Sequence, residues 1–246
     1  MPSATTSGCT MSKNTAPLPD WELVLSSAAR LQRILPDAVL VGGTASAIHA
    51  GHRFSRDADH VLTDLRHRFD AVLAQLESVA GWKTARVQRP VQILGSLDGI
   101  ETGVRQLIRD APLETAVVDY HGARITVPTE GEILRIKGVL ILKRNATRDY
   151  LDFVALADHM GDARVALALQ SFDRLYQQDS GESPLQQLQV QLANALPYDL
   201  EETELGEYKN LHPRWHDWQV VKLACAHLST AIFDRVCQMD FGAHGN

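Results

Sequence analysis

Two aspartates separated by one residue are the part of this chain best suited to chemistry. Asp57 and Asp59 lie in a segment that has the pattern of a strand. Side chains of a strand alternate between its two faces, so these two carboxylates project to the same side. Carboxylates held that close repel each other unless a cation lies between them, and hard oxygen ligands suit Mg²⁺ or Mn²⁺ bound together with substrate phosphates. The spacing therefore predicts a metal site.

A small-residue turn lies just before this acidic segment. The apolar run that begins at Leu40 ends in Gly42, Gly43 and Thr44, and a helix over about residues 44–51 is expected to follow. The free N–H groups at such a helix start attract anions. A glycine pair alone is usually an ordinary turn, and a lone Asp-x-Asp is usually solvated. Their succession, one helix apart, favours a site for phosphate and metal.

A basic stripe follows later in the chain. Between Arg135 and Arg148 every charged residue is basic. At about 100° per residue, Lys137, Arg144 and Arg148 share one side of a continuous helix. Such a stripe suits the neutralisation of a triphosphate. Alternatively, the helix breaks near Asn145 and restarts with Thr147 as its N-cap, which would rotate Arg148 relative to Lys137.

Two blocks of residues together resemble a known family. The first block is Gly42-Gly43-Thr44-Ala45 followed by Gly51-His52-Arg53-x-Ser55-x-Asp57-x-Asp59, and the second is Lys137, Arg144 and Arg148-Asp149-x-x-Asp152. They are similar to the motifs of the AbiEii/AbiGii toxin group, which belongs to the polymerase-beta-like nucleotidyltransferase superfamily. The resemblance covers about residues 36–160, and the blocks occur in the order typical of that group.

The resemblance implies an enzyme that moves a nucleotide from a nucleoside triphosphate to an acceptor with the help of Mg²⁺ or Mn²⁺. Such a reaction needs positioning and charge neutralisation above all. Asp57 and Asp59 would then hold the metals, while Gly42, Gly43 and Thr44 would contact the β and γ phosphates. The remaining motif residues that the resemblance places in the nucleotide site are Ser55, Lys137, Arg144, Arg148, Asp149 and Asp152.

A third carboxylate from a later strand is normal in that superfamily, where it helps to activate the attacking hydroxyl. Glu101 lies between apolar neighbours in an expected strand, whereas Asp119 lies close to the His121-Gly122 turn. We prefer Glu101, because a mid-strand position fixes a side chain better than a place beside a hairpin loop. Both residues remain candidates, and either could simply be a polar residue on the exposed face of a sheet.

The acceptor is less well defined by the residues. With a formal net charge of −6, the chain lacks the overall basic field of a protein that grips a long nucleic acid. The resemblance implies tRNA or a protein hydroxyl as acceptor and a toxin that an antitoxin partner opposes. The alternatives are an aminoglycoside-like small molecule as acceptor, or a nucleotide-binding module without activity. An aromatic and basic group near the C-terminus could stack on a base or ribose, although packing is its commoner use: Tyr208, Lys209, His212, Arg214, Trp215 and Trp218.

Composition and pattern predict an α+β fold. With 246 residues and 45% hydrophobic content, the chain can bury a substantial core. Residues 1–19 read as a disordered tail without the apolar stretch of a signal peptide, and no apolar run approaches the roughly 20 residues that span a bilayer, so we expect a cytoplasmic protein that does not contact membranes. Residues 20–128 should form a nucleotidyltransferase-type catalytic core with a mixed sheet and flanking helices, and residues 129–246 a helical C-terminal region that carries the second motif.

The expected elements of the catalytic core alternate between helices and strands. Helices are expected near residues 21–35, 44–51 and 66–79, and strands near 39–41, 57–62, 83–87, 91–94, 100–107, 115–120 and 124–127. After Pro128 the pattern is helical, with breaks expected at Gly161, at residues 179–181 and around residues 197–206.

Overall fold

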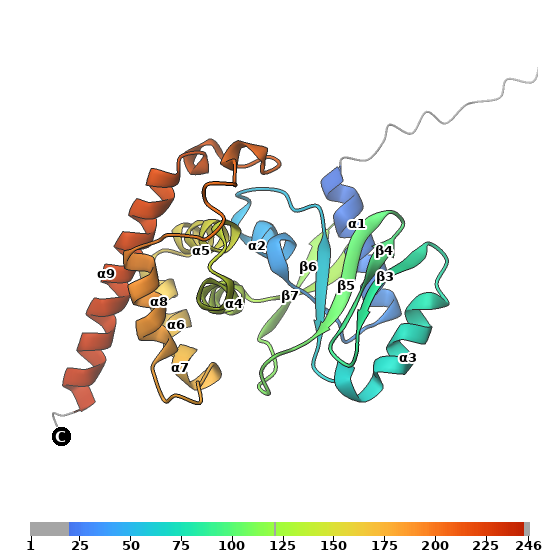
Figure 1. Cartoon of the computed structure of the whole chain (residues 1–246), viewed down its shortest axis with the longest axis horizontal. Coiled ribbons are helices and arrows are strands. Elements are labelled where there is room, and N and C mark those ends of the chain that lie inside the picture. Colours follow the sequence, from blue (N-terminus) through green and yellow to red (C-terminus); the bar gives the residue numbers. More distant parts are fainter. Residues whose placement is uncertain (1–19, 121, 244–246) are drawn as a thin grey trace, which may run out of the picture.

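The structure of the chain is a computed structural model that describes residues 20–120 and 122–243. Its first half builds a five-stranded sheet, a separate β-hairpin and three helices (Figure 1). The elements are α1 (Asp20–Ile34), β1 (Val39–Leu40), α2 (Gly42–Ala50), β2 (Ala58–Leu62), α3 (Leu65–Glu77), β3 (Trp82–Gln88), β4 (Gln92–Leu97), β5 (Ile100–Gln106), β6 (Thr115–Tyr120) and β7 (Ala123–Pro128). The N-terminal tail expected over residues 1–19 lies outside the described residues.

The five strands are ordered β1-β2-β5-β4-β3. Strands β2 and β5 run parallel at the centre, and the other neighbouring pairs are antiparallel. The register aligns Ala58 with Thr102 and Asp59 with Gly103. This mixed sheet brings two segments about 44 residues apart in the chain side by side.

The two faces of this sheet differ in what covers them. Along β2, Ala58, His60 and Leu62 are buried, whereas Asp59 and Val61 are only partly buried. Leu62 belongs to the cluster in which α3 and the end of α1 pack on the sheet. Because side chains of a strand alternate, the carboxylate of Asp59 lies on the opposite face. That face looks toward the helical half of the molecule (Figure 1).

The second half of the chain is helical. Its elements are α4 (Glu130–Arg144), α5 (Thr147–Met160), α6 (Asp162–Leu169), α7 (Phe172–Leu175), α8 (Pro184–Ala193), two short 3₁₀ helices (Leu205–Glu207 and Pro213–Trp215) and α9 (Trp218–Ala243). They share one apolar core, and Ala45 of α2 packs into it. Helix α2 thus lies between the sheet and the helices (Figure 1). Among the described residues, no helix is long and apolar enough to cross a membrane.

The α+β class, the strands and the helical second half confirm the sequence prediction, and the differences are local. Helix α2 begins at Gly42 instead of Thr44, and Asp57 lies one residue before β2. The continuous helix from Lys137 to Arg148 is wrong: Asn145 adopts a left-handed conformation with φ 46°, which ends α4 before α5 begins. Asparagine tolerates this conformation better than most residues, and the restart at Thr147 is the alternative that the sequence left open. Ala146, not Thr147, occupies the N-cap position. The division between residues 128 and 129 stays a prediction.

Candidate active site

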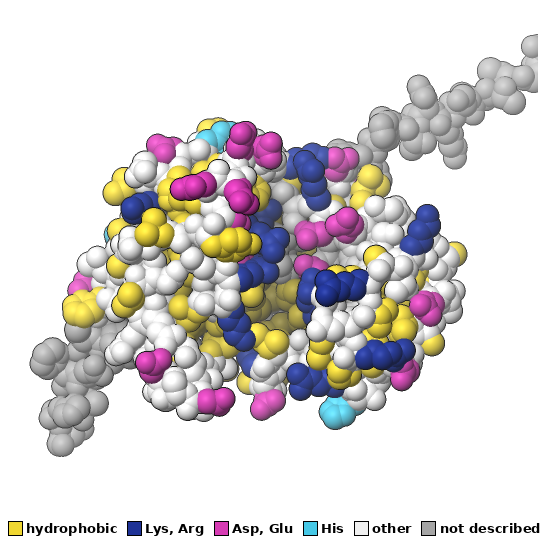
Figure 2. Space-filling view, viewed as in Figure 1, with side chains coloured by type: hydrophobic (Ala, Val, Ile, Leu, Met, Phe, Trp, Pro, Cys, Tyr) yellow, Lys and Arg dark blue, Asp and Glu magenta, His cyan; other side chains and the backbone are white. Residues whose placement is uncertain are grey.

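A hollow separates the sheet from the helical half, with basic side chains along its walls and apolar side chains at its floor (Figure 2). It contains two adjoining chambers. The polar chamber, of about 870 Å³, lies by the start of α2. The apolar groove, of about 760 Å³, runs between the open face of the sheet and α4. Residues that line both are Gly42, Asp57, Asp59, Glu101, Arg144 and Arg148.

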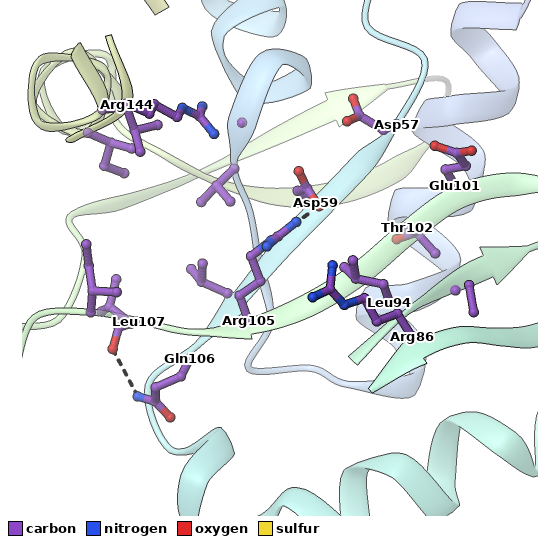
Figure 3. A pocket seen from close by; sticks show the side chains of 18 of the residues that line it. Asp57, Asp59, Arg86, Leu94, Glu101, Thr102, Arg105, Gln106, Leu107 and Arg144 are labelled. Carbon is purple, nitrogen blue, oxygen red and sulfur yellow. Dashed lines mark hydrogen bonds and ion pairs between the residues drawn. The ribbon is translucent and has the colours of Figure 1, made fainter. Parts of the chain in front are cut away.

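Three carboxylates lie where the two chambers meet (Figure 3). Asp57 and Glu101 each directly precede the paired residues Ala58 and Thr102, so they lie at the same level of two neighbouring parallel strands. Asp59 follows two residues along, on the same side of β2 as Asp57. Their position at the same part of the hollow is therefore a consequence of the β2–β5 register.

The negative charges of Asp57 and Asp59 lie close enough to repel each other. Burial raises the pKa of the Asp59 carboxyl, and the neighbouring Asp57 carboxylate raises it further. Nearby arginines act in the opposite direction, and Arg105 Nε lies 3.7 Å from Asp59 Oδ1. The hydroxyl of Ser55 donates a hydrogen bond of 2.5 Å to Asp57 Oδ1. A cation at this point would relieve the repulsion between the carboxylates.

The donor set fits a hard divalent cation held by two carboxylates. Within residues 20–120 and 122–234, whose side chains the structure describes, no group of three or more His, Cys, Asp or Glu side chains is placed to hold one ion together. Mg²⁺ is commonly bound by one or two carboxylates plus substrate phosphates and water. Asp57 and Asp59 supply that number, and Glu101 lies in the same chamber without completing a protein-only cage.

The glycine turn lies beside the carboxylates. Gly42 has φ +72°, and a methyl group there would lie 3.6 Å from Cβ of Asp59. Gly42 and Gly43 line the polar chamber at the start of α2, where backbone N–H groups are unpaired. The hydroxyl of Thr44 is buried and donates instead to the carbonyl oxygen of Asp57, at 2.5 Å. Thr44 thus fixes the acidic segment against α2, and its phosphate contact stays a prediction.

Gly43 is required by close packing. A methyl group at this position would lie 2.5 Å from Nη2 of Arg53 and 2.9 Å from Oγ of Ser55. We expect Gly43→Ala to destabilise the protein by about 1–3 kcal/mol and to weaken nucleotide binding, because Arg53 is held in place and cannot withdraw. Gly206→Ala is the matched control for stability, since a methyl group there meets no atom within 4 Å. Urea unfolding of both variants and nucleotide titration of Gly43→Ala against the wild type test this, and a loss of stability no larger than that of Gly206→Ala would contradict it.

A buried network of charges forms the wall behind the polar chamber. Asp152 is fully buried and receives two hydrogen bonds from Arg53, at 2.8 and 3.0 Å. The ammonium of Lys137 lies 2.7 Å from Asp152 Oδ2 and 3.3 Å from Asp149 Oδ1. His52 Nε2 lies 2.8 Å from Asp152 Oδ1. The network therefore ties the first motif, after α2, to α4 and α5.

These charges compensate one another strongly. Burial alone would raise the pKa of the Asp152 carboxyl, but Arg53, Lys137 and the hydrogen bond from His52 outweigh it. The pKa of Asp152 therefore lies well below its usual range. A carboxylate with a lowered pKa stabilises the fold at pH values above its unfolded pKa, and this stabilisation is lost as the pH falls through the folded value.

The predicted basic residues reach the chambers in different ways. Lys137 is 1% exposed and lines the polar chamber while paired with both buried aspartates. Arg144 donates to both oxygens of Asp149, at 2.5 and 2.9 Å, and still lines both chambers. Arg148 is exposed and lines both as well. Despite the break at Asn145, the three cations face the same hollow. Asp149 and Asp152 hold Lys137 from behind, and Asp149 also holds Arg144.

The two candidates for the third carboxylate lie in different places. Glu101 is exposed and lines both chambers. Asp119 lies on the separate β6–β7 hairpin, accepts a hydrogen bond from the backbone N–H of Gly122 at 3.1 Å, and lines neither chamber. Its local bond is that of a turn residue.

Several lining residues had no role in the sequence analysis. Arg53 belongs to the first motif, but its partner Asp152 lies 99 residues away along the chain. The sequence pattern therefore did not predict this pair. Arg86 and Arg105 reach the groove from β3 and β5. Of the C-terminal aromatic and basic group, only Tyr208 and Lys209 line a chamber. Trp215 is buried instead, and Trp218 packs edge-on against Tyr150.

A mixed sheet with a glycine turn beside carboxylates and cations across the hollow is the arrangement expected of a nucleotidyltransferase. The chain belongs to the AbiEii family of that class, because the family model described as nucleotidyl transferase AbiEii toxin, type IV TA system, matches residues 25–221. The family is accordingly one of nucleotidyl transferases.

Comparison with individual proteins adds two findings. The crystal structure of an H. pylori protein described as a nucleotidyltransferase shares the fold of this chain, with a TM-score of 0.51 and 17% sequence identity. The match covers 89% of this chain and 98% of that one. The chain is also 30% identical over 244 residues to the heme uptake protein MmpL11 of Mycobacterium tuberculosis, and 28% identical over 218 residues to the mycolic acid-containing lipids exporter MmpL11 of Mycolicibacterium smegmatis. These matches cover 89% and 87% of this chain but 23% and 22% of those proteins. The chain thus spans less than a quarter of the length of the curated relatives it matches.

Proposed function

We propose that this chain transfers a nucleotide from a nucleoside triphosphate to a hydroxyl of tRNA or of a protein, with Mg²⁺ or Mn²⁺ as cofactor. The acceptor hydroxyl attacks the α-phosphorus, the bond from that phosphorus to the bridging oxygen breaks, and pyrophosphate leaves with the bonding electrons. Metal held by Asp57 and Asp59 would neutralise phosphate charge. Glu101, as the third carboxylate, takes the proton of the attacking hydroxyl.

The observation that carries this proposal is that the two chambers share the carboxylates. A triphosphate in the polar chamber would lie against the N–H groups of Gly42 and Gly43, with the row of cations opposite. An acceptor in the apolar groove would approach the same carboxylates from the other side. In-line displacement needs the attacking and leaving oxygens on opposite sides of the phosphorus, and two chambers that share Asp57 and Asp59 are compatible with this requirement.

The charges of the groove favour an anionic acceptor such as an RNA end. Apart from the three shared carboxylates, the ionisable lining groups that carry charge are all cations: Lys83, Arg86, Arg105, Arg109, Arg144 and Arg148. Arg109 and Arg144 are paired with the buried Glu132 and Asp149, so the excess positive charge of the groove rests mainly on Lys83, Arg86 and Arg148. This excess favours phosphates over a cationic aminoglycoside. We therefore rank RNA ahead of a protein hydroxyl and both ahead of an aminoglycoside-like molecule.

The test is to incubate the purified chain with each labelled nucleoside triphosphate, Mg²⁺ and either total RNA, cell lysate or an aminoglycoside panel. We expect label to enter RNA, and to do so with the wild type but not with Asp57→Asn. Label in protein or in an aminoglycoside would reassign the acceptor. No transfer to any of them by the correctly folded chain would contradict the proposed activity.

The third carboxylate is tested by a pair of variants. Glu101→Gln should lower kcat about 100- to 10,000-fold while nucleotide binding with Mg²⁺ persists, because only the proton acceptor is removed. Asp119→Asn should leave kcat near the wild-type value, since Asp119 lies outside both chambers. The reverse pattern would move the acceptor side of the site to the β6–β7 hairpin.

The type IV toxin family implies an antitoxin partner and a nucleoside triphosphate as substrate. We include toxin activity in the proposal, together with a cytoplasmic location beside the RNA acceptor. Expression of the wild type should then slow growth of the host cell, whereas Asp57→Asn at equal protein level should not. If cells that express the wild type and cells that express Asp57→Asn grow equally well, the proposed toxin activity is wrong, whereas the transferase activity is judged by the labelling assay.

A further inference from the structure

The polar chamber has two chemically different ends. One end carries the glycine turn with Lys137, Arg144 and Arg148. The other end is formed by Phe54 and by residues 202–209, which run across the chamber from the C-terminal half. Three exposed glutamates of that segment line it: Glu202, Glu204 and Glu207. Arg56 and Lys209 also line the chamber, and Lys209 pairs with Asp20. The glutamates outnumber these two cations, so a triphosphate is attracted more strongly to the first end.

Two aromatic rings line the second end of the chamber, Phe54 and Tyr208. Both are only partly buried, so part of each ring faces the chamber. The ring of Phe54 stacks on Trp21, with centroids 5.0 Å apart and planes 8° apart. The guanidinium of Arg53 lies over the Tyr208 ring, 5.4 Å from its centroid. Each ring is therefore supported from one side.

The backbone holds these two rings together. The N–H of Phe54 donates to the carbonyl oxygen of Lys209 at 2.7 Å, and the N–H of His212 donates to the carbonyl oxygen of His52 at 2.7 Å. Arg53, between them in sequence, is fixed by its two hydrogen bonds to Asp152. The aromatic end of the chamber is thus built on the same buried network that anchors the phosphate end. A rigid aromatic surface of this kind is suited to stacking a base.

We infer that Phe54 and Tyr208 form the nucleoside subsite of the polar chamber, with the base of the nucleoside triphosphate stacked against them and its phosphates pointing toward Gly43. This inference rests on the proposed function and adds the orientation of the nucleotide. It also gives the segment of residues 202–209 a role: the segment closes the base end of the chamber and repels the phosphates from it.

The test compares ligands with and without a base. Binding of ATP, CTP, GTP and UTP, and of inorganic tripolyphosphate, is measured by calorimetry at fixed free Mg²⁺ without acceptor. The variants are Tyr208→Ala and Phe54→Ala, with Tyr208→Phe retaining a ring. Tyr198→Ala is the matched control, because Tyr198 is exposed and lines neither chamber.

We expect Tyr208→Ala and Phe54→Ala to raise the Kd of nucleoside triphosphates about 5- to 150-fold and to leave the Kd of tripolyphosphate unchanged. Tyr198→Ala should bind all ligands as the wild type does, and Tyr208→Phe, which keeps the ring, should retain most of the nucleoside triphosphate affinity that Tyr208→Ala loses. Such a selective loss in at least one of the two alanine variants supports the inference. The inference is overturned if neither alanine variant loses affinity selectively for nucleoside triphosphates. An equal loss of affinity for tripolyphosphate is not selective, because it would indicate a disturbed chamber instead of a lost base contact.

Failure of the proposed function is detected separately, as absence of transfer by the wild type in the labelling assay. If the wild type binds neither nucleoside triphosphate nor tripolyphosphate, the subsite is wrong together with the activity. If the wild type binds both ligands but the alanine variants lose nothing, only the nucleoside subsite is wrong. Thermal unfolding of each variant confirms that the fold persists before binding is compared.

Discussion

Replacing Asp57 or Asp59 by asparagine is expected to lower kcat/KM for nucleotide transfer by at least about 100-fold, because metal-assisted charge stabilisation is worth several kcal/mol in such reactions. Stability should be unchanged or slightly higher. Burial and the Asp57 charge raise the pKa of Asp59, so the folded chain bears a repulsion that either substitution removes. The measurements are steady-state transfer kinetics and urea unfolding without metal.

The matched control for both substitutions is Asp179→Asn, which changes an exposed aspartate outside the two chambers. It should leave both transfer and stability at wild-type values. In Asp57→Asn, the new amide oxygen can still accept the hydrogen bond from Ser55. Near wild-type transfer by either site variant on a true acceptor would show that the two carboxylates do not hold the metal.

The largest loss of stability is expected at Asp152. Asp152→Ala would leave the buried cations Arg53 and Lys137 without their shared partner, and breaking a buried pair in this way typically costs about 3–5 kcal/mol. Lys137→Ala should also be destabilising, since it would leave Asp149 and Asp152 undercompensated, and it should weaken nucleoside triphosphate binding as well. Urea unfolding measures the first effect and nucleotide titration the second.

Helix α5 supplies its own control for the Asp152 experiment. Asp158 lies on the same helix and pairs with Arg214 at 2.7 Å, but both side chains are about half exposed. Exposed pairs contribute about 0–1 kcal/mol, so Asp158→Ala should have a small effect. Similar losses for the two variants would mean that burial does not determine the contribution of Asp152. Full stability of Lys137→Ala with weakened nucleotide binding would instead make Lys137 a phosphate ligand without a structural role.

The residues of the two motifs determined much of this protein by themselves. Alternation along a strand was enough to put Asp57 and Asp59 on one face, because it depends only on backbone geometry. The glycine pair and the apolar periodicity were enough to predict the helix beside them and the helical second half. The family likewise followed from residue types and their order. These features are local, so a single sequence contains them.

Only the tertiary structure decided which distant groups meet. The parallel pairing of β2 with β5 brings Glu101 level with Asp57, and no local pattern reports strand order. The left-handed Asn145 ends α4, yet chain packing returns Arg144 and Arg148 to one hollow. Lys137 was expected in a basic stripe that neutralises a triphosphate, and only the structure shows that it is buried and paired with Asp149 and Asp152. Charges pair through space, and their energies depend on burial, which the order of residues along a chain does not contain.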